Sequence, residues 1–182
     1  MENLTSATKR RQFLKYMIAG TAGSLALGWL FPQRVQSREF EEVDLETLCS
    51  SFPYNSRCVD YLPGVRAVDN DKKPIQASLL LANAQPGTPL PVKGLPNTTY
   101  LVITEGPKFA DYGIRPVCTH LGCTVKWREE QKRFVCPCHG SQYDPQGRVV
   151  KGPAKRPLPL VTVVVKQDQI RLIDRDSGFD PR

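Results

Sequence analysis

The sequence predicts a mainly β protein in which one antiparallel β domain, at about residues 61–176, carries a small metal-binding lobe at about 116–155. Three observations support this fold class. Runs of β-branched and aromatic residues alternate with short polar turns. Proline, with 16 of 182 residues, has about twice its usual share and disfavours long helices. All the histidines and four of the six cysteines fall within one short stretch.

Length, composition and charge further restrict the kind of protein that this chain can be. A chain of 182 residues has room for about one domain. Its hydrophobic content of 40% and charged content of 24% are close to globular averages, which excludes a wholly disordered chain. The net charge is +7, but no Lys/Arg cluster follows the first 15 residues, so nucleic acid is not an expected partner.

The first 37 residues have the pattern of a targeting segment. Arg10-Arg11-Gln12-Phe13-Leu14-Lys15 precedes an uncharged stretch from Tyr16 to Gln33, which is the pattern of a twin-arginine export signal. An ordinary basic flank of a membrane helix is the alternative. The uncharged residues span about 27 Å as a helix, close to the ~30 Å of a hydrocarbon core. We therefore expect one retained transmembrane helix, with cleavage near Val35-Gln36-Ser37 as the other possibility.

Residues 38–60 are expected to form a linker. A short helix is predicted through Asp44–Cys49, with Leu45 and Leu48 on its apolar side. Cys49 and Cys58 follow, and in an oxidising compartment they are expected to form a disulfide that closes a small loop. A second metal site is the alternative, but no histidine lies nearby.

The strands are predicted from the residue types. Thr99–Thr104 is rich in β-branched and aromatic residues. A hairpin is predicted from Thr124–Trp127 and Arg133–Cys136, and a second one from Leu160–Lys166 and Gln169–Ile173. Residues 177–182 are expected to be a tail.

Two similar boxes define the candidate site. The first is Cys118-Thr119-His120-Leu121-Gly122-Cys123 and the second is Cys136-Pro137-Cys138-His139-Gly140-Ser141. The residues between the boxes form the first predicted hairpin, which brings the boxes together. Zinc would take four of these ligands and leave two cysteines over.

A pairing of one Cys and one His from each box instead matches Rieske ligation of a [2Fe–2S] cluster. The ligands would be Cys118, His120, Cys136 and His139. Cys123 and Cys138 are then free to join the loops by a disulfide. Each imidazole is expected to bind iron through Nδ1 and to present Nε2 outward.

The chain resembles Rieske iron–sulfur subunits of cytochrome bc complexes, and most closely the cytochrome b6f type of oxygenic photosynthesis. The similarity covers roughly residues 95–175 and the N-terminal signal. The matching segments are Tyr100-Leu101-Val102, Tyr112-Gly113-Ile114, Val117–Trp127, Phe134–Tyr143 and Gln146–Ala154.

The resemblance assigns roles to particular residues. It implies that the four ligands above hold the cluster and that Cys123 and Cys138 form a disulfide. Gly152-Pro153-Ala154 resembles the proline loop that covers the cluster. Ser141 and Tyr143 match residues whose hydroxyls bond to cluster or ligand sulfur, which stabilises the reduced state and raises the potential.

The resemblance also implies a function and a location. The cluster would take an electron from (plasto)quinol and pass it to a c-type cytochrome, with His120 and His139 as proton-coupled contacts. The chain would be the redox subunit of a quinol–cytochrome or plastoquinol–plastocyanin reductase, beside cytochrome b, a c-type cytochrome and membrane lipid. Its Rieske domain would lie on the lumenal or periplasmic side of a thylakoid or plasma membrane.

Two departures from the family keep other interpretations open. Residues 34–60 contain no glycine, whereas photosynthetic Rieske subunits usually carry a glycine-rich hinge there. Lys155-Arg156 also interrupt a region that is usually small and apolar. The chain could therefore be a divergent paralogue, or an exported Rieske small subunit of another periplasmic oxidoreductase. An oxygenase-type ferredoxin is disfavoured because such sites lack the second cysteine pair, and a zinc-stabilised binding module is the remaining alternative.

Overall fold

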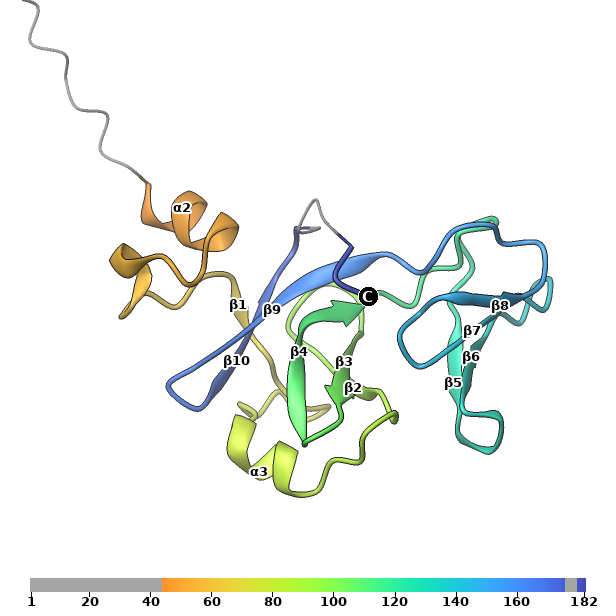
Figure 1. Cartoon of the computed structure of the whole chain (residues 1–182), viewed down its shortest axis with the longest axis horizontal. Coiled ribbons are helices and arrows are strands. Elements are labelled where there is room, and N and C mark those ends of the chain that lie inside the picture. Colours follow the sequence, from red (N-terminus) through yellow and green to blue (C-terminus); the bar gives the residue numbers. More distant parts are fainter. Residues whose placement is uncertain (1–43, 176–179) are drawn as a thin grey trace, which may run out of the picture. The chain divides into compact units, whose positions relative to one another are not determined.

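The computed structural model describes residues 44–175 and 180–182. Two helices, two short 3₁₀ helices and ten strands follow one another along this part of the chain (Figure 1). They are α2 (Leu45–Ser51), η1 (Ser56–Cys58), β1 (Val65–Arg66), α3 (Ala77–Ala82), β2 (Leu90–Val92), β3 (Thr99–Thr104), β4 (Lys108–Ile114), β5 (Lys126–Arg128), η2 (Glu129–Gln131), β6 (Arg133–Val135), β7 (Gln142–Tyr143), β8 (Val149–Lys151), β9 (Leu160–Lys166) and β10 (Gln169–Ile173).

The larger sheet has six antiparallel strands in the order β1-β10-β9-β4-β3-β2. Strands β3, β9 and β10 have the predicted bounds. The β9–β10 turn places Gln167 and Asp168 at positive φ, as a two-residue hairpin turn requires. The Asp168 carboxylate also accepts bonds from the backbone N–H and the hydroxyl of Ser78, at 2.7 and 2.9 Å. These bonds attach the start of α3 to the hairpin.

The smaller sheet has four antiparallel strands in the order β5-β6-β7-β8 and forms the lobe that carries the boxes (Figure 1). The predicted hairpin is therefore confirmed, with η2 in its turn. One buried cluster of side chains joins the two sheets: Tyr112 and Ile114 come from β4, and Phe134 and Tyr143 come from the lobe. The lobe is thus packed on the larger sheet by apolar contact.

A disulfide closes the region before the first sheet strand. Cys49, in α2, and Cys58, in η1, are both fully buried and are bonded to each other. The side chain of Asp44 caps α2 by accepting from the backbone N–H groups of Glu46 and Thr47. The helix buries Cys49 and Ser50, whereas Leu45, which we expected on its apolar side, is 43% exposed. The disulfide fixes which face of the helix is buried.

Polar contacts attach residues 44–64, which we call the N-terminal module, to the larger sheet. Arg171 of β10 donates to the backbone carbonyls of Leu62, Pro63 and Gly64. Lys166 of β9 donates to the carbonyl of Cys58. The expected linker, residues 38–60, is therefore folded from Asp44 onward: the Cys49–Cys58 disulfide closes it, Lys166 binds its Cys58 carbonyl, and Arg171 binds the residues that follow it.

The shorter elements have too little pattern to be predicted from the sequence. Strand β4 contains Asp111 and Gly113, and its burial does not alternate regularly, so it lacks the period-2 pattern of a strand. Strands β1, β2, β7 and β8 have two or three residues each, too few for any period to show. Helix α3 has six residues, and its pattern is equally short.

The predicted transmembrane helix falls within residues 1–37, outside the described part of the chain. Among the described residues, no helix is long and apolar enough to cross a membrane.

Candidate metal centre

The two boxes fold into loops with the same backbone hydrogen bonds. In the first loop, the Cys118 N–H donates to Cys123 O at 2.8 Å, and the Gly122 N–H donates to Cys118 O at 2.9 Å. In the second, the Cys136 N–H donates to Ser141 O at 2.8 Å, and the Gly140 N–H donates to Cys136 O at 3.1 Å. Both glycines adopt positive φ, 79° and 69°, a conformation that favours glycine. The repeated box pattern in the sequence therefore encodes a repeated loop.

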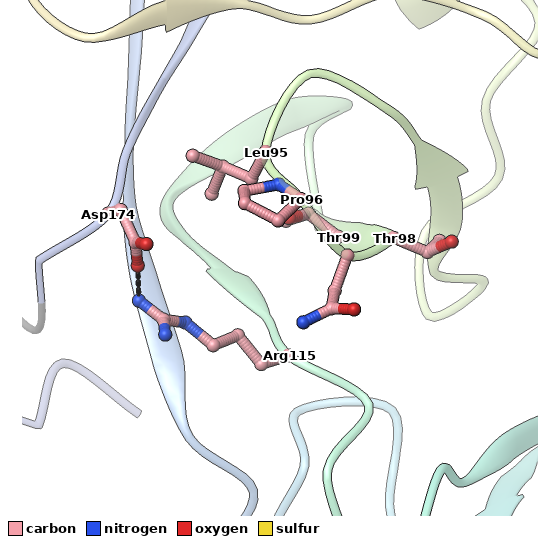
Figure 2. Close-up of a pocket in the computed structure, with 7 residues that line it drawn as sticks. Leu95, Pro96, Thr98, Thr99, Arg115 and Asp174 are labelled. Atoms are coloured by element: carbon pink, nitrogen blue, oxygen red, sulfur yellow. Dashed lines mark hydrogen bonds and ion pairs between the residues drawn. The ribbon is translucent and has the colours of Figure 1, made fainter.

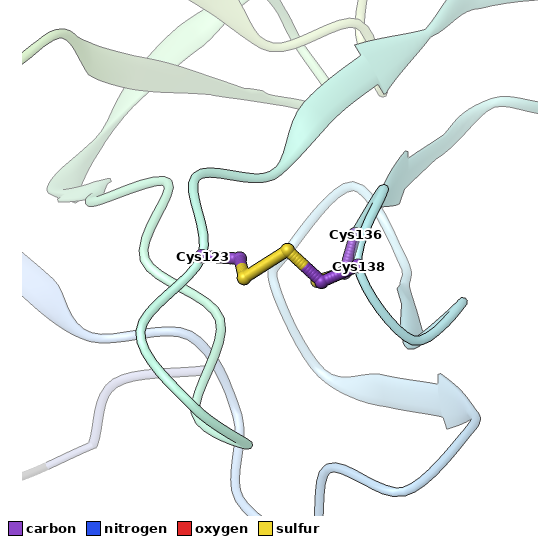
Figure 3. A group of neighbouring side chains, drawn as sticks. All are labelled: Cys123, Cys136 and Cys138. Carbon is purple, nitrogen blue, oxygen red and sulfur yellow. A yellow bond between two sulfur atoms is a disulfide. The ribbon is translucent and has the colours of Figure 1, made fainter.

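Four of the six cysteines are paired and two are free. Cys123 is bonded to Cys138 across the two loops, and Cys118 and Cys136 are buried free thiols, each 2% exposed. The sulfurs of Cys123, Cys136 and Cys138 lie within 4.8 Å of one another, and Figure 3 shows Cys136 beside the disulfide. Since a disulfide sulfur is not a thiolate ligand, only Cys118 and Cys136 can supply thiolates here.

The two imidazoles meet at the ends of the loops. The ring centroids of His120 and His139 are 4.8 Å apart, with the ring planes at 90°. His139 is exposed and His120 is half-buried. Within the described residues, the Nδ1 atom of His120 is buried and has no hydrogen-bond partner. A buried nitrogen without a partner is costly unless something binds it.

The hydroxyl of Tyr143 lies beside one free thiol. Its oxygen is 3.3 Å from Cys118 Sγ and 3.3 Å from the Thr119 backbone N–H that donates to it. Burial raises the pKa of the Cys118 thiol, but the bonds from Tyr143 and from the His120 backbone N–H leave that pKa below its ordinary value. Burial and the bond to Cys118 raise the pKa of Tyr143, so the phenol keeps its proton as a donor.

Ser141 connects the second box to the expected proline loop. Its side chain is fully buried, and its Oγ accepts from the Ala154 N–H at 3.2 Å. The proton of the Ser141 hydroxyl therefore remains available for another acceptor. Gly152 approaches so closely that a Cβ there would lie 2.5 Å from the Ser141 Cα. Only glycine allows the covering loop to come this near.

These residues fit the cluster that the sequence predicts. Two buried thiols, Cys118 and Cys136, lie beside two imidazoles, and the buried Nδ1 of His120 lacks a partner among the residues that the structure describes. Thiolate and imidazole ligands in equal number are the donor set of a Rieske [2Fe–2S] centre. Bound there, the group would supply one-electron transfer.

Thr119 also belongs to this site, although it was not predicted from the sequence. The Thr119 hydroxyl donates to the backbone carbonyl of Arg156, which belongs to the segment after the proline loop. It is also 3.3 Å from the Tyr143 hydroxyl. The position of Thr119 between two predicted ligands was the one feature of the sequence that could have indicated this role. The carbonyl to which it donates lies 37 residues away.

Two hollows lie away from these loops. One, with a volume of about 50 Å³, is lined by Leu95–Thr99 together with the Arg115–Asp174 ion pair (Figure 2). The other, of about 450 Å³, lies where β4 and β9 stop pairing, and the Tyr54 hydroxyl donates to Asp111 at 3.2 Å beside it. Neither hollow contains a predicted site residue.

Comparisons with known proteins agree on one family. A model of the Rieske [2Fe-2S] domain matches residues 79–166. The cytochrome b6-f complex iron-sulfur subunit of Prochlorococcus marinus strain AS9601 is 36% identical over 174 residues, which make up 95% of this chain and 88% of that protein. The subunit of the same name from Gloeobacter violaceus is 46% identical over 111 residues, or 59% of this chain and 60% of that protein.

Among solved structures, the cyanobacterial plasma membrane Rieske protein PetC3 from Synechocystis PCC 6803 is 31% identical. The alignment covers 53% of this chain and 93% of that one, with a TM-score of 0.42.

Proposed function

This chain belongs to the family of Rieske iron–sulfur subunits of cytochrome b6-f complexes, with one [2Fe–2S] cluster per chain, and on that premise we propose that it transfers electrons from quinol to a c-type cytochrome. The observation that carries the proposal is the donor set: two buried free thiols beside two imidazoles, one of which has a buried nitrogen with no partner in the described part of the chain. We assign Cys118, His120, Cys136 and His139 as the cluster ligands.

The protein residues have distinct tasks in this transfer. Cys118 and Cys136 hold the buried side of the site, and His139 is exposed at the outer side. An imidazole that binds through Nδ1 can present Nε2–H to a quinol. The exposed Leu121, at 69%, lies beside His120, so the outer surface can meet an apolar partner. The Tyr143 and Ser141 hydroxyls stabilise added negative charge from the buried side.

The wider setting of the protein is also part of the proposal. We place the chain in a membrane complex as a single-pass protein, with the Rieske domain on the lumenal or periplasmic side and cytochrome b, a c-type cytochrome and membrane lipid as partners. This rests on the names of its relatives, which are cytochrome b6-f subunits, and on the twin-arginine and apolar pattern of residues 10–33. The complex would carry out the quinol–cytochrome or quinol–plastocyanin reductase reaction.

Metal analysis and isolation of the complex test this proposal. The purified chain should contain two iron atoms and two acid-labile sulfides, because four ligands divide equally between two irons. It should also purify from membranes together with cytochromes. One zinc per chain without sulfide would overturn the cluster assignment. An iron-loaded protein that purifies with a different oxidoreductase would favour the alternative, an exported small subunit.

A second experiment separates a principal subunit from a paralogue. Residues 44–64 are bonded to the sheet, and residues 34–43, which precede them in the sequence, contain no glycine. Glycine allows changes in conformation most readily. We therefore expect slow cytochrome re-reduction after a flash when this chain replaces a glycine-hinged Rieske subunit. Replacing residues 34–43 by a glycine-rich segment should speed it. Full-speed re-reduction by the unmodified chain would make it the principal subunit.

A further inference from the structure

Arg182 has a buried guanidinium group that contacts the turn after Tyr143 and the segment that follows the expected proline loop. Its side chain is only 5% exposed. The Asp180 carboxylate accepts from its Nε and from its Nη2, each at 2.8 Å. Burial of a guanidinium is favourable only when its donors are bound, and here both sides of the planar group have partners.

The other partners of Arg182 are backbone carbonyls from two separate segments. Its Nη1 donates to Leu158 O at 2.9 Å and lies 3.4 and 3.5 Å from the carbonyl oxygens of Gln146 and Gly147. The same segments are joined by one backbone bond, from the Leu158 N–H to Gly147 O at 2.8 Å. Arg182 therefore adds a second connection between two segments that this backbone hydrogen bond also joins.

Both segments lead directly to the site. The turn that contains Gln146 and Gly147 follows Tyr143, whose hydroxyl contacts Cys118 Sγ. The segment that ends at Leu158 contains the Arg156 carbonyl, which accepts from the Thr119 hydroxyl. The Tyr143 hydroxyl and the Arg156 carbonyl thus both contact Thr119 of the first loop, and each is close in sequence to one of the two segments that Arg182 joins.

We propose that Arg182 is a positioning residue that keeps the Tyr143 hydroxyl in bonding distance of Cys118. The proposal rests on the assignment of Cys118 as a cluster ligand. Without the guanidinium, the bond from the Leu158 N–H to Gly147 O is the one hydrogen bond that still joins the two segments within the described part of the chain. The Tyr143 hydroxyl then bonds to the ligand sulfur less of the time, and the reduced state loses part of its stabilisation.

The test is an epistasis measurement of the midpoint potential on the intact, cluster-loaded protein. R182Q should lower the midpoint potential, as Tyr143→Phe does. The decrease should be no larger than the decrease caused by Tyr143→Phe. R182K, which keeps a charge but loses the planar fork, should lie between R182Q and the parent protein. In the Tyr143→Phe background R182Q should add little, because both changes remove the same bond. Arg175→Gln is the matched control, since Arg175 bonds to Ser51 and not to the lobe, and its potential should not change.

The outcomes distinguish this proposal from a merely structural role. An unchanged potential in R182Q, with lower thermal stability, would mean that Arg182 stabilises the fold only. A full additional fall in the Tyr143→Phe background would also overturn the proposal. If R182Q binds no cluster, R182K is used instead to measure the midpoint potential, both alone and in the Tyr143→Phe background. A parent protein without iron and sulfide would instead refute the proposed function itself.

Discussion

The two regions of this chain that contain disulfides differ in burial and in how their polar groups are bonded. In the N-terminal module, Cys49 and Cys58 are fully buried, and the polar groups around them bind one another. At the cluster-binding loops, Cys138 and His139 are exposed, and within the described residues the buried His120 Nδ1 has no partner.

Glu46 shows how complete the first region is. Its carboxylate accepts from the Ser50 hydroxyl, the Tyr61 hydroxyl and the Gly64 N–H at 2.7–3.0 Å. The two loops are instead joined by the Cys123–Cys138 disulfide, and their imidazoles meet with ring centroids 4.8 Å apart. The comparison teaches that the module binds its polar groups with protein partners, whereas the loops keep two buried free thiols and a His120 nitrogen that has no partner among the described residues.

Removal of a ligand thiol should show the largest difference in effect between the two regions. We expect Cys136→Ala to contain no bound iron or sulfide, because one iron loses a thiolate that no nearby free thiol replaces. Hydrogen exchange should become faster in residues 118–123 and 136–141, while residues 44–64 keep their protection. Cys118→Ala should behave in the same way. A full iron complement in either variant would refute the ligand assignment.

Removal of each disulfide should have different consequences. Cys123→Ser with Cys138→Ser should speed loss of the cluster to a chelator and change its potential, because the two ligand loops are no longer joined. Cys49→Ser with Cys58→Ser should leave the potential unchanged and lower the free energy of unfolding by about 2–4 kcal/mol. Thermal unfolding and a redox titration of both double variants measure this. Equal effects on the potential would remove the distinction between the regions.

The two hydroxyls should tune the potential without affecting the module. Tyr143→Phe and Ser141→Ala each remove one donor, so each should lower the midpoint potential with the cluster still assembled. A hydrogen bond to a charged group contributes ~1.5–3 kcal/mol, which for one electron sets an upper scale of roughly 60–130 mV per hydroxyl. The double variant should fall further. Tyr54→Phe is the control, since its hydroxyl bonds to Asp111 away from the site.

The smallest expected effect is a pH dependence of the module. The bond from the Gly64 N–H, followed by that from Tyr61, lowers the pKa of Glu46 below its ordinary value of 4.5. A lowered folded-state pKa means that this stabilisation is complete above about pH 4.5 and is lost as the pH falls through the folded-state pKa.

The melting temperature measured between pH 3 and pH 7 tests this effect. Glu46→Gln should flatten the acid side of the curve. Glu105→Gln, at an exposed position between β3 and β4, should leave it unchanged. The same acid slope in Glu46→Gln as in the parent would show that another group controls this pH dependence.

Much of the site could be predicted from the sequence because its information is local. Each box contains its proposed ligands, its glycine and its loop-closing bonds within six residues. The strands β3, β9 and β10 could also be predicted from the sequence, because each is a run of five to seven residues that contains β-branched residues.

Other features were decided only by tertiary structure, because they depend on groups distant in sequence. Lys166 binds the Cys58 carbonyl and Arg171 the carbonyls of residues 62–64, across more than 100 positions, and these bonds attach the folded part of the expected linker to the sheet. Thr119 meets a carbonyl 37 residues away, and Arg182 meets one 24 residues away. Such bonds involve backbone acceptors, which every residue carries, so side-chain types alone give no signal for them. The sequence by itself determined the donor set and the loops that hold it. The tertiary structure decided which distant groups hold those loops in place, since a carbonyl becomes a specific partner only when the fold brings it near.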